Sequence, residues 1–454
     1  MDILPLPDSI AEVAREEMAR ESVPGLSVAL VHEGRTYAAG FGVTNVNHPL
    51  PVTPDTYFRI GSTSKTFTAT ALMQVVEAGL VELEAPVRRY IPDFRLESEP
   101  DAAAMRVRHV LTHHGGWVGD YFRDTGPGDD ARALIVAKMA RSPQIIPVGT
   151  AFSYSNAAFY VAGRILEVVT GRVFEDIITD RIFRPLAMDH STYWPEEAMV
   201  HSVAIGHVPG PLGPQPVTTY KAPRSIAPAS SVISSAIDQI RYAAFHIGDG
   251  TTPTGDCVLK AETLRYMQSP LYPGGGVCDA VGISWEIDHL PGGVDIVKHG
   301  GSIGGQLSAF EMVPKRAYAC TVLTNAESGR GPRQNVADAA RHHFLHLDET
   351  PAPLIAVPDA ELDDYCGRYS SVLFDVHVQR GLEGLVVMDR SSVRTADGAR
   401  VVPDATPLRL GFIGPGRVRI LDQPRPGERC EFERDATGKV IWMRWDGRVC
   451  PRVE

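Results

Sequence analysis

The stretch Phe58-Arg-Ile-Gly-Ser62-Thr-Ser-Lys65-Thr-Phe67 combines the end of a predicted strand with the start of a predicted helix. Ser62 and Lys65 are three residues apart, so they would share one helix face. A serine hydroxyl is a weak nucleophile until a base removes its proton, and a lysine can act as that base when burial or neighbouring cations lower its pKa. The helix N-terminus would add N–H groups and partial positive charge beside the Ser62 oxygen. Taken alone, the pair is more typical of a helix-capping serine followed by a solvated lysine.

A second polar cluster, Ser153-Tyr154-Ser155-Asn156, follows a turn at Pro147-Val-Gly149. The phenol of Tyr154 can transfer a proton, and the amide of Asn156 can form a hydrogen bond to Lys65 or to a substrate carbonyl. The alternative interpretation is a half-buried tyrosine followed by an asparagine that caps the next helix.

A third pattern, Lys298-His299-Gly300-Gly301-Ser302, lies at the end of a predicted strand. Two consecutive glycines let a backbone approach a ligand closely. An N–H of Ser302 that faced the N–H of Ser62 would form an oxyanion hole, and His299 would supply a polar or cationic group beside it. The alternative is a glycine-rich hairpin corner with a surface histidine.

The order and spacing of the three patterns resemble the serine β-lactamase and penicillin-binding-protein superfamily. Its motifs are S-x-x-K, then Y-x-N or S-x-N, then K-T-G or H-x-G on a strand. They correspond here to Ser62-x-x-Lys65, Tyr154-x-Asn156 and His299-Gly-Gly301. The resemblance covers residues 8–347, and three further segments support it: Phe58 to Leu83, Val110 to Gly116 and Phe183 to Met188. It implies an acyl-enzyme mechanism in which Ser62 is the nucleophile, Lys65 its base and Tyr154 a proton donor and acceptor, supported by Asn156 and His299.

The variants of the motifs narrow the resemblance. A tyrosine in the second motif is typical of the class C branch, whose relatives include esterases, D-stereospecific peptidases, amidases and acyltransferases. His299 stands where class C β-lactamases usually carry lysine, and the chain has neither S-D-N nor K-T-G. We therefore expect an esterase, peptidase or transferase more than a β-lactamase.

The distribution of helix and strand patterns predicts an α+β fold. Strand patterns near both ends of the first region flank a helical middle, which favours one antiparallel sheet packed with helices, like that of class C β-lactamases. The expected helices span residues 8–22, 63–78, 156–171, 231–247, 261–268 and 332–347. The expected strands span residues 25–32, 35–41, 281–287, 294–299, 308–313 and 319–324, with the first two joined by a turn at Glu33-Gly34.

We expect a catalytic domain over residues 1–350, a proline-rich linker over 351–358 and a second domain over 359–454. Turn signals recur about every ten residues in this last part, which is typical of a small all-β barrel or sandwich. The resemblance implies a lipocalin-like barrel, as in certain peptidases and in standalone penicillin-binding-protein-type thioesterases that cyclise nonribosomal peptides.

This layout implies an enzyme that off-loads a nonribosomal peptidyl thioester with a C-terminal D-residue and closes it head to tail. A peptidyl carrier protein is then an expected partner. The alternatives are an esterase or D-stereospecific peptidase or amidase, and, further from the pattern, a β-lactamase or a non-catalytic binding homologue. The mechanism requires no metal and no organic cofactor.

Composition excludes some other functions. The 454 residues carry a formal net charge of −11, which argues against nucleic acid or an anionic membrane as the main partner. No apolar run approaches the roughly 18–20 residues of a membrane span, and no signal-peptide pattern is present, so we expect a cytoplasmic protein. The six cysteines are scattered, which favours free thiols, although an exported chain would permit a disulfide among the last three.

Further candidates concern substrate binding. Trp117, Tyr121 and Phe122 lie in a long polar loop and are predicted to form a substrate-binding rim. Gly300 and Gly301 are predicted to bind substrate through their backbone. The alternative is a surface loop anchored by its aromatic residues. Arg224 is a candidate partner for a substrate carboxylate. His342, His343 and His346 lack a further ligand in the sequence, so we interpret them as a solvated helix face.

Overall fold

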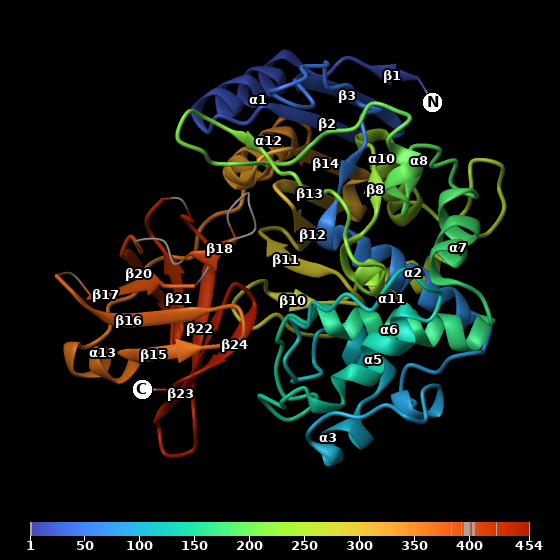
Figure 1. Cartoon of the computed structure of the whole chain (residues 1–454). Helices are drawn as coiled ribbons and strands as arrows, with labels where there is room; N and C mark the ends of the chain where they lie inside the picture. The colour runs from blue at the N-terminus through green and yellow to red at the C-terminus, as the bar shows by residue number, and fades with distance from the viewer. Residues whose placement is uncertain are drawn as a thin grey trace.

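The protein consists of a sheet packed with helices and a separate β-barrel beside it (Figure 1). The computed structural model describes residues 2–382, 384–391, 393–394, 400–401, 405–423 and 425–453. The barrel, coloured orange to red in Figure 1, lies against the helical part and the sheet edge of the first region.

The main sheet has nine strands in the order β1-β3-β2-β14-β13-β12-β11-β10-β9. All neighbouring pairs are antiparallel except β1 with β3. The strands are β1 (Ile3–Leu4), β2 (Gly25–His32), β3 (Arg35–Gly42), β9 (Tyr272–Pro273), β10 (Ala280–Val281), β11 (Glu286–Leu290), β12 (Val294–Ile303), β13 (Gln306–Val313) and β14 (Tyr318–Thr324). Because β14 pairs with β2, the two ends of this region meet in one sheet, and the predicted α+β fold is confirmed.

Helices cover both faces of the sheet. The N-terminal α1 (Asp8–Arg20) packs against α12 (Arg330–Leu345), and both bury apolar side chains on one face. On the other face, α10 (Ala236–Ile247) contacts β14 and β2. Strand β12 lies inside this sheet, between β13 and β11.

A helical region lies next to the sheet around α2 (Ser64–Glu77) and α6 (Asn156–Thr170). Ser155 caps α6 because its Oγ accepts the N–H of Ala158, and Gly171 ends the helix with a φ of 68°. The other helices are α3 (Glu99–Ala104), α4 (Val107–Leu111), α5 (Ala131–Lys138), α7 (Phe174–Ile178), α8 (Pro195–Ala198), α9 (Ala227–Ser230), α11 (Ala261–Met267) and α13 (Asp359–Tyr365).

Two expectations about secondary structure were wrong. Residues 231–235 do not belong to a helix, because β8 (Ile233–Ser234) pairs with β4 (Phe58–Arg59) and Ser235 then caps α10. The expected strand 281–287 is two strands, since the chain turns between them and Ser284 has a φ of 64°.

The C-terminal part is an eight-stranded antiparallel barrel in the order β15-β16-β17-β20-β21-β22-β23-β24. Its strands are β15 (Gly367–Ser370), β16 (Asp375–Gly381), β17 (Gly384–Asp389), β20 (Leu408–Gly414), β21 (Arg417–Ile420), β22 (Arg429–Arg434), β23 (Val440–Trp445) and β24 (Arg448–Pro451). A bridge between Tyr369 and Arg452 links the two outermost strands. The prediction of a small β-barrel is confirmed, whereas the domain boundaries stay a prediction.

Two further expectations from the sequence concern disulfides and membrane-spanning helices. All six cysteines are free, so the alternative disulfide among the last three is not formed. Across the described residues, every helix is too short or too polar to cross a membrane.

The helical region contains a buried charge cluster around Arg132 of α5. Its guanidinium is fully buried and forms ion pairs with Glu167 and Glu175, whose side chains are also buried. Because each charge has lost its water, the cluster is stable only while all its members are present.

We predict that Arg132→Met lowers the free energy of unfolding by about 3–5 kcal/mol, since it removes the fully buried cation that the two carboxylates share and leaves Glu167 with Arg164 and Glu175 with Arg224 alone. Arg106→Met is the matched control, because Arg106 forms an exposed pair with Glu84 at 2.9 Å and its loss costs less than about 1 kcal/mol. Thermal and urea unfolding of both variants provide the test. Equal stability of the two variants would contradict the prediction.

Candidate active site

Ser62 lies in a short 3-10 turn, η1 (Gly61–Thr63), directly before α2. Its side chain is partly exposed, whereas Thr63, Ser64 and Lys65 are buried. Hydrogen bonds fix this turn, because Ser64 Oγ accepts the N–H of Val232 at 3.0 Å and Thr63 Oγ1 lies 2.9 Å from Ser308 Oγ. The hydroxyl of Ser62 is thus reachable from outside while its surroundings are rigid.

Two glycines allow the backbone of β12 to lie directly against the turn that carries Ser62. A Cβ atom on Gly301 would lie 1.9 Å from the carbonyl oxygen of Ile60, and one on Gly61 would lie 2.5 Å from the nitrogen of Ser302. Gly61 also has a φ of 54°, which L-residues rarely adopt. The structure therefore brings the main chain of Ser302 next to Ser62, as an oxyanion hole would require.

Lys65 is completely buried and its Nζ has three oxygen neighbours. They are Ser62 Oγ at 3.1 Å, Asn156 Oδ1 at 2.7 Å and the carbonyl oxygen of Ala229 at 2.9 Å. The amide and carbonyl oxygens only accept, whereas the serine hydroxyl can also donate. A neutral amine has two N–H groups for these two acceptors and one lone pair that can accept the proton of Ser62.

The surroundings of Lys65 favour this neutral form. Burial lowers the pKa of its amine well below the ordinary value, and the nearby charge of Arg448 lowers it further. The carboxylate of Asp120 acts in the opposite direction. A lysine with this environment can act as a general base near neutral pH.

Tyr154 is packed among aromatic and cationic groups. Nζ of Lys65 lies 4.8 Å from its ring centroid, the ring of His113 stacks on it at 4.3 Å, and the guanidinium carbon of Arg448 lies 4.5 Å from its centroid. Burial raises the pKa of the Tyr154 phenol, although Arg448 and the hydroxyl of Ser62 partly oppose this. The phenol is therefore a proton donor in the resting protein.

His299 is buried, and of the polar or cationic group expected at this position it fits the polar one. Burial lowers the pKa of its imidazole to about 3, and the neighbouring Lys65 contributes to the shift. Nδ1 lies 2.7 Å from the carbonyl oxygen of Gly300, which can only accept, so Nδ1 carries the proton. His299 is a neutral imidazole whose Nε2 remains an acceptor, with its ring 6.3 Å from that of Tyr154.

Two of the predicted substrate-binding residues are wrong. Trp117 is only 1% exposed and packs against Phe94 in the core, so it cannot form a substrate rim. Arg224 already has carboxylate partners, because its guanidinium pairs with Glu175 at 3.1 Å and with Asp129 at 2.7 Å. Both side chains stabilise the helical region instead.

The remaining substrate-binding candidates, Tyr121 and Gly300, lie in different surroundings. Tyr121 is partly buried and lines a surface pocket with Arg123 and Lys138. Gly300 lies on β12 beside His299, with the guanidinium of Arg333 at 3.7 Å from the position of a Cβ atom. Their contact with substrate stays a prediction.

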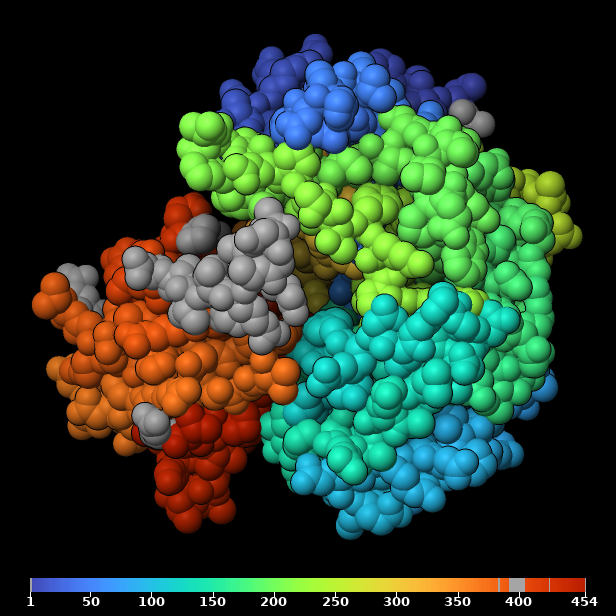
Figure 2. Space-filling model, in the orientation of Figure 1, coloured from blue at the N-terminus to red at the C-terminus, as the bar shows by residue number. Residues whose placement is uncertain are grey.

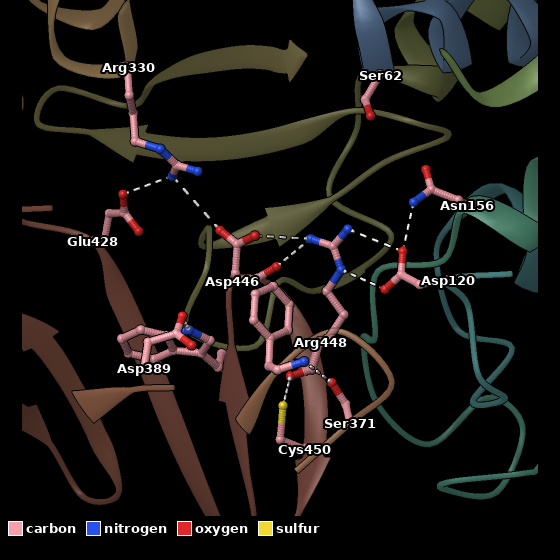
Figure 3. Close-up of polar contacts among 12 residues, drawn as sticks. Ser62, Asp120, Asn156, Arg330, Ser371, Asp389, Glu428, Asp446, Arg448 and Cys450 are labelled. Atoms are coloured by element: carbon pink, nitrogen blue, oxygen red, sulfur yellow. Dashed lines mark hydrogen bonds and ion pairs between the residues drawn. The ribbon is translucent and has the colours of Figure 1, made fainter. Parts of the chain in front are cut away.

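Two residues that the sequence analysis did not single out complete the site, as Figure 3 shows. Asp120 accepts a hydrogen bond from Asn156 Nδ2 at 2.8 Å, and Arg448 of the barrel pairs with Asp120 at 3.1 Å. Asp120 belongs to the polar loop that contains Trp117 and Tyr121, which was a usable signal. Arg448 has no such signal, because it is distant in the sequence and belongs to the other part of the chain.

The site can be reached from outside, because Ser62 is partly exposed. Figure 2 shows a hollow between the green segment and the cyan helical region, with olive and blue atoms at its floor. The contacts of Arg448 place the barrel directly at the border of this site.

Comparisons with known proteins agree with this geometry. Residues 10–343 match the protein family described as Beta-lactamase. The chain is 34% identical to penicillin-binding protein 4 of Amycolatopsis lactamdurans over 349 residues, which cover 75% of this chain and 90% of that protein. It is 30% identical to the unguisins hydrolase ungD' of Aspergillus campestris over 338 residues, which cover 71% of this chain and 62% of that protein.

Solved structures extend the likeness to the barrel. The crystal structure of SurE superposes with a TM-score of 0.77 at 23% identity and covers 98% of this chain and 99% of its own. The octameric penicillin-binding protein homologue from Pyrococcus abyssi covers the same shares with a TM-score of 0.67 at 25% identity. The D-amino acid amidase from Ochrobactrum anthropi has a TM-score of 0.60 at 26% identity and covers 74% of this chain and 98% of its own.

The close approach of β12 to the serine turn gives a prediction. Gly301→Ala must push β12 away from Ile60, so we expect the reaction of Ser62 with a fluorophosphonate to slow about 100-fold, as a displacement of about 1 Å does in enzymes. Gly331→Ala is the control, because a Cβ there has no neighbour within 4 Å, and its rate should stay within about twofold. The labelling is stopped at set times and the adduct is quantified by intact mass, which gives the rate for each variant. Equal rates for Gly301→Ala and Gly331→Ala would refute the role of Gly301 in holding β12 against the serine turn.

Proposed function

Since the chain belongs to the β-lactamase family of serine hydrolases and acyltransferases, we propose that it forms an acyl-enzyme on Ser62 with Lys65 as the base. The observation that carries this proposal is the buried Lys65 amine, 3.1 Å from Ser62 Oγ, with two acceptors for its own N–H groups. This arrangement leaves the lone pair for the serine proton.

In the first step, the Lys65 amine takes the proton of Ser62, and Oγ attacks the carbonyl carbon of an acyl donor. The N–H groups of Ser62 and Ser302 hold the negative oxygen of the tetrahedral intermediate. Tyr154 donates its proton to the leaving group, and Lys65 returns a proton to the phenolate. The acyl chain is then bonded to Ser62, and the leaving group departs as the neutral thiol, alcohol or amine.

In the second step, Tyr154 and Lys65 work in reverse. The proton of an incoming amine or water passes to the phenol–amine pair, and the same proton is delivered to Ser62 Oγ as the acyl bond breaks. Asn156 positions Lys65 through the 2.7 Å contact with its amide oxygen. His299, as a neutral acceptor, supports the phenol without adding charge.

We propose that the acyl donor is a nonribosomal peptidyl thioester, that its C-terminal residue is a D-residue, and that its own N-terminal amine closes the ring. A fold likeness across the whole chain to SurE, a surugamide cyclase, supports this proposal, as does the structure of SurE with D-Leu. The barrel, proposed to be lipocalin-like, is part of that likeness. A peptidyl carrier protein would then deliver the donor, in the cytoplasm.

A second candidate is hydrolysis of an ester, peptide or amide through the same acyl-enzyme. The relationship to a protein named a hydrolase favours it, and so does the likeness to a D-amino acid amidase, whose structure with D-phenylalanine is also similar. A β-lactamase and a non-catalytic binding protein are the less favoured alternatives. Water and an amine compete for the same acyl-enzyme, so product analysis separates cyclisation from hydrolysis.

We predict that Ser62→Ala abolishes covalent labelling by a phosphonate, because no other hydroxyl lies at Nζ of Lys65 among its contacts in the described residues. Ser64→Ala is the matched control, since its Oγ accepts the N–H of Val232 and does not contact Lys65 Nζ, so its loss can slow labelling through the turn but cannot abolish it. Intact mass should show one adduct on the native chain and on Ser64→Ala. Undiminished labelling of Ser62→Ala would refute Ser62 as the nucleophile.

We predict that peptidyl thioesters with a C-terminal D-residue yield cyclic product, whereas their L-counterparts react at least about tenfold more slowly. The products are separated by liquid chromatography, and the loss of water relative to the linear acid identifies the ring by mass. Ser62→Ala serves as the blank for uncatalysed cyclisation. Purely linear product from every donor would reject the cyclase and leave the hydrolase.

A further inference from the structure

The barrel contacts the second motif of the active site through the tip of one hairpin. Strands β23 and β24 are joined by Asp446 and Gly447, whose φ angles of 47° and 79° suit a two-residue turn. The carbonyl oxygen of Gly447 accepts the N–H of Tyr154 at 2.8 Å, and the N–H of Val449 donates to Ser153 Oγ at 3.2 Å. The barrel thus contributes main-chain contacts to the segment that holds Tyr154.

The hairpin tip is held in place from both parts of the protein (Figure 3). The carboxylate of Asp446 lies 3.1 Å from Arg425 of the barrel and 3.8 Å from Arg330 of α12. Arg330 also pairs with Glu428 of the barrel at 2.9 Å. Asp446 in turn accepts hydrogen bonds from Arg448 through its carbonyl oxygen and its carboxylate. These contacts hold the side chain of Arg448 in place, and its guanidinium extends from them to the active site.

At the active site, Arg448 meets a carboxylate that is 8% exposed. Its Nε lies 3.1 Å from Asp120 Oδ2, and its Nη2 lies 3.4 Å from Asp120 Oδ1. Oδ1 also accepts the hydrogen bond from Asn156 Nδ2 at 2.8 Å. A buried carboxylate is costly without a cation, so Arg448 supplies the cation beside the Asp120 carboxylate that accepts from Asn156.

The orientation of the Asn156 amide follows from this contact. An amide has one acceptor end and one donor end, so a carboxylate at the NH₂ end leaves the oxygen to face Lys65. The reversed amide would point its oxygen at the carboxylate and its NH₂ group at the lysine amine. Asp120 therefore determines that the oxygen of the Asn156 amide, and not its NH₂ group, faces Lys65.

We propose that Asp120 and Arg448 are a positioning pair in which the barrel, through Arg448, fixes the Asn156 amide and thereby the Lys65 base. This inference rests on the proposed acyl-enzyme function, and it assigns to the barrel a part in catalysis. Asp120 acts through Asn156, and Arg448 acts through Asp120, through its charge and through the Tyr154 ring, whose centroid lies 4.5 Å from its guanidinium carbon.

The charges of Asp120 and Arg448 shift the pKa of the Lys65 amine in opposite directions, so this pKa is a specific readout of the pair. Asp120 raises the pKa of the Lys65 amine and Arg448 lowers it. The other titratable groups that face Lys65 are uncharged near neutral pH, because burial lowers the pKa of His113 and of His299 and raises that of Tyr154. Because the base works in its neutral form, the rate of acylation rises with pH through the Lys65 pKa.

The test compares Asp120→Asn, Arg448→Met, Arg448→Lys and the double variant Asp120→Asn/Arg448→Met in the full chain. We expect each charge-removing single variant to slow phosphonate labelling about 10- to 100-fold. The acid limb of the rate should move about one pH unit lower in Asp120→Asn and about one unit higher in Arg448→Met. Arg448→Lys keeps the charge and should leave the limb near its native position.

The double variant should lose less than the product of the two single losses, because the pair is removed together and no buried charge is left alone. Arg434→Met, which removes an exposed barrel ion pair with Asp364, is the control and should label at the native rate. Thermal melting excludes unfolded variants. Multiplicative losses, or limbs that stay in place or move in the same direction, would overturn the proposal.

A second measurement does not depend on activity. With lysine carrying ¹³C at Cε, the Lys65 resonance is identified by its loss in Lys65→Arg, and its titration gives the amine pKa directly. Opposite shifts in Asp120→Asn and Arg448→Met support the pair even if the native chain fails to react with the phosphonate, which would reject the acyl-enzyme function alone. Unchanged titration in both variants overturns the pair.

Discussion

The burial of the Lys65 amine is the constraint on which the rest of the site depends. An ammonium group without water is unfavourable, so the structure must either pair it with an anion or let it lose its proton. Here the direct neighbours are an amide oxygen, a main-chain carbonyl and the Ser62 hydroxyl, and none carries charge. The neutral histidines His113 and His299 fit the same requirement, because further cations would be equally unfavourable in this interior.

The sequence predicted those features that depend on local pattern. The spacing of Ser62 and Lys65 placed them correctly beside each other, and the consecutive glycines after a strand corresponded to a real contact between two backbones. The predictions failed where burial reversed a residue's usual role. Trp117 lies in a polar loop but anchors that loop in the core. For His299 the sequence left a polar and a cationic role open, and burial selects the polar one.

Asp120 and Arg448 show a different limit. A salt bridge between residues 328 positions apart leaves no periodicity and no spacing that a single sequence can reveal. Each residue alone looks like an ordinary surface charge, because arginine and aspartate are common in loops and turns. Only the closure of the barrel and its docking on the helical region bring the guanidinium to Asp120. Long-range electrostatic contacts of this kind require the fold to be known first.

The turn at Asp446 and Gly447 has a consequence for the evolution of this architecture. A barrel fused to a catalytic domain is often regarded as an exchangeable module, but this one carries one end of the contacts that hold Asn156. A chimera with a relative's barrel would inherit a competent site only if its hairpin delivered a guanidinium to the same place. The two parts must therefore change together, so this hairpin and the loop around Asp120 form one unit of selection.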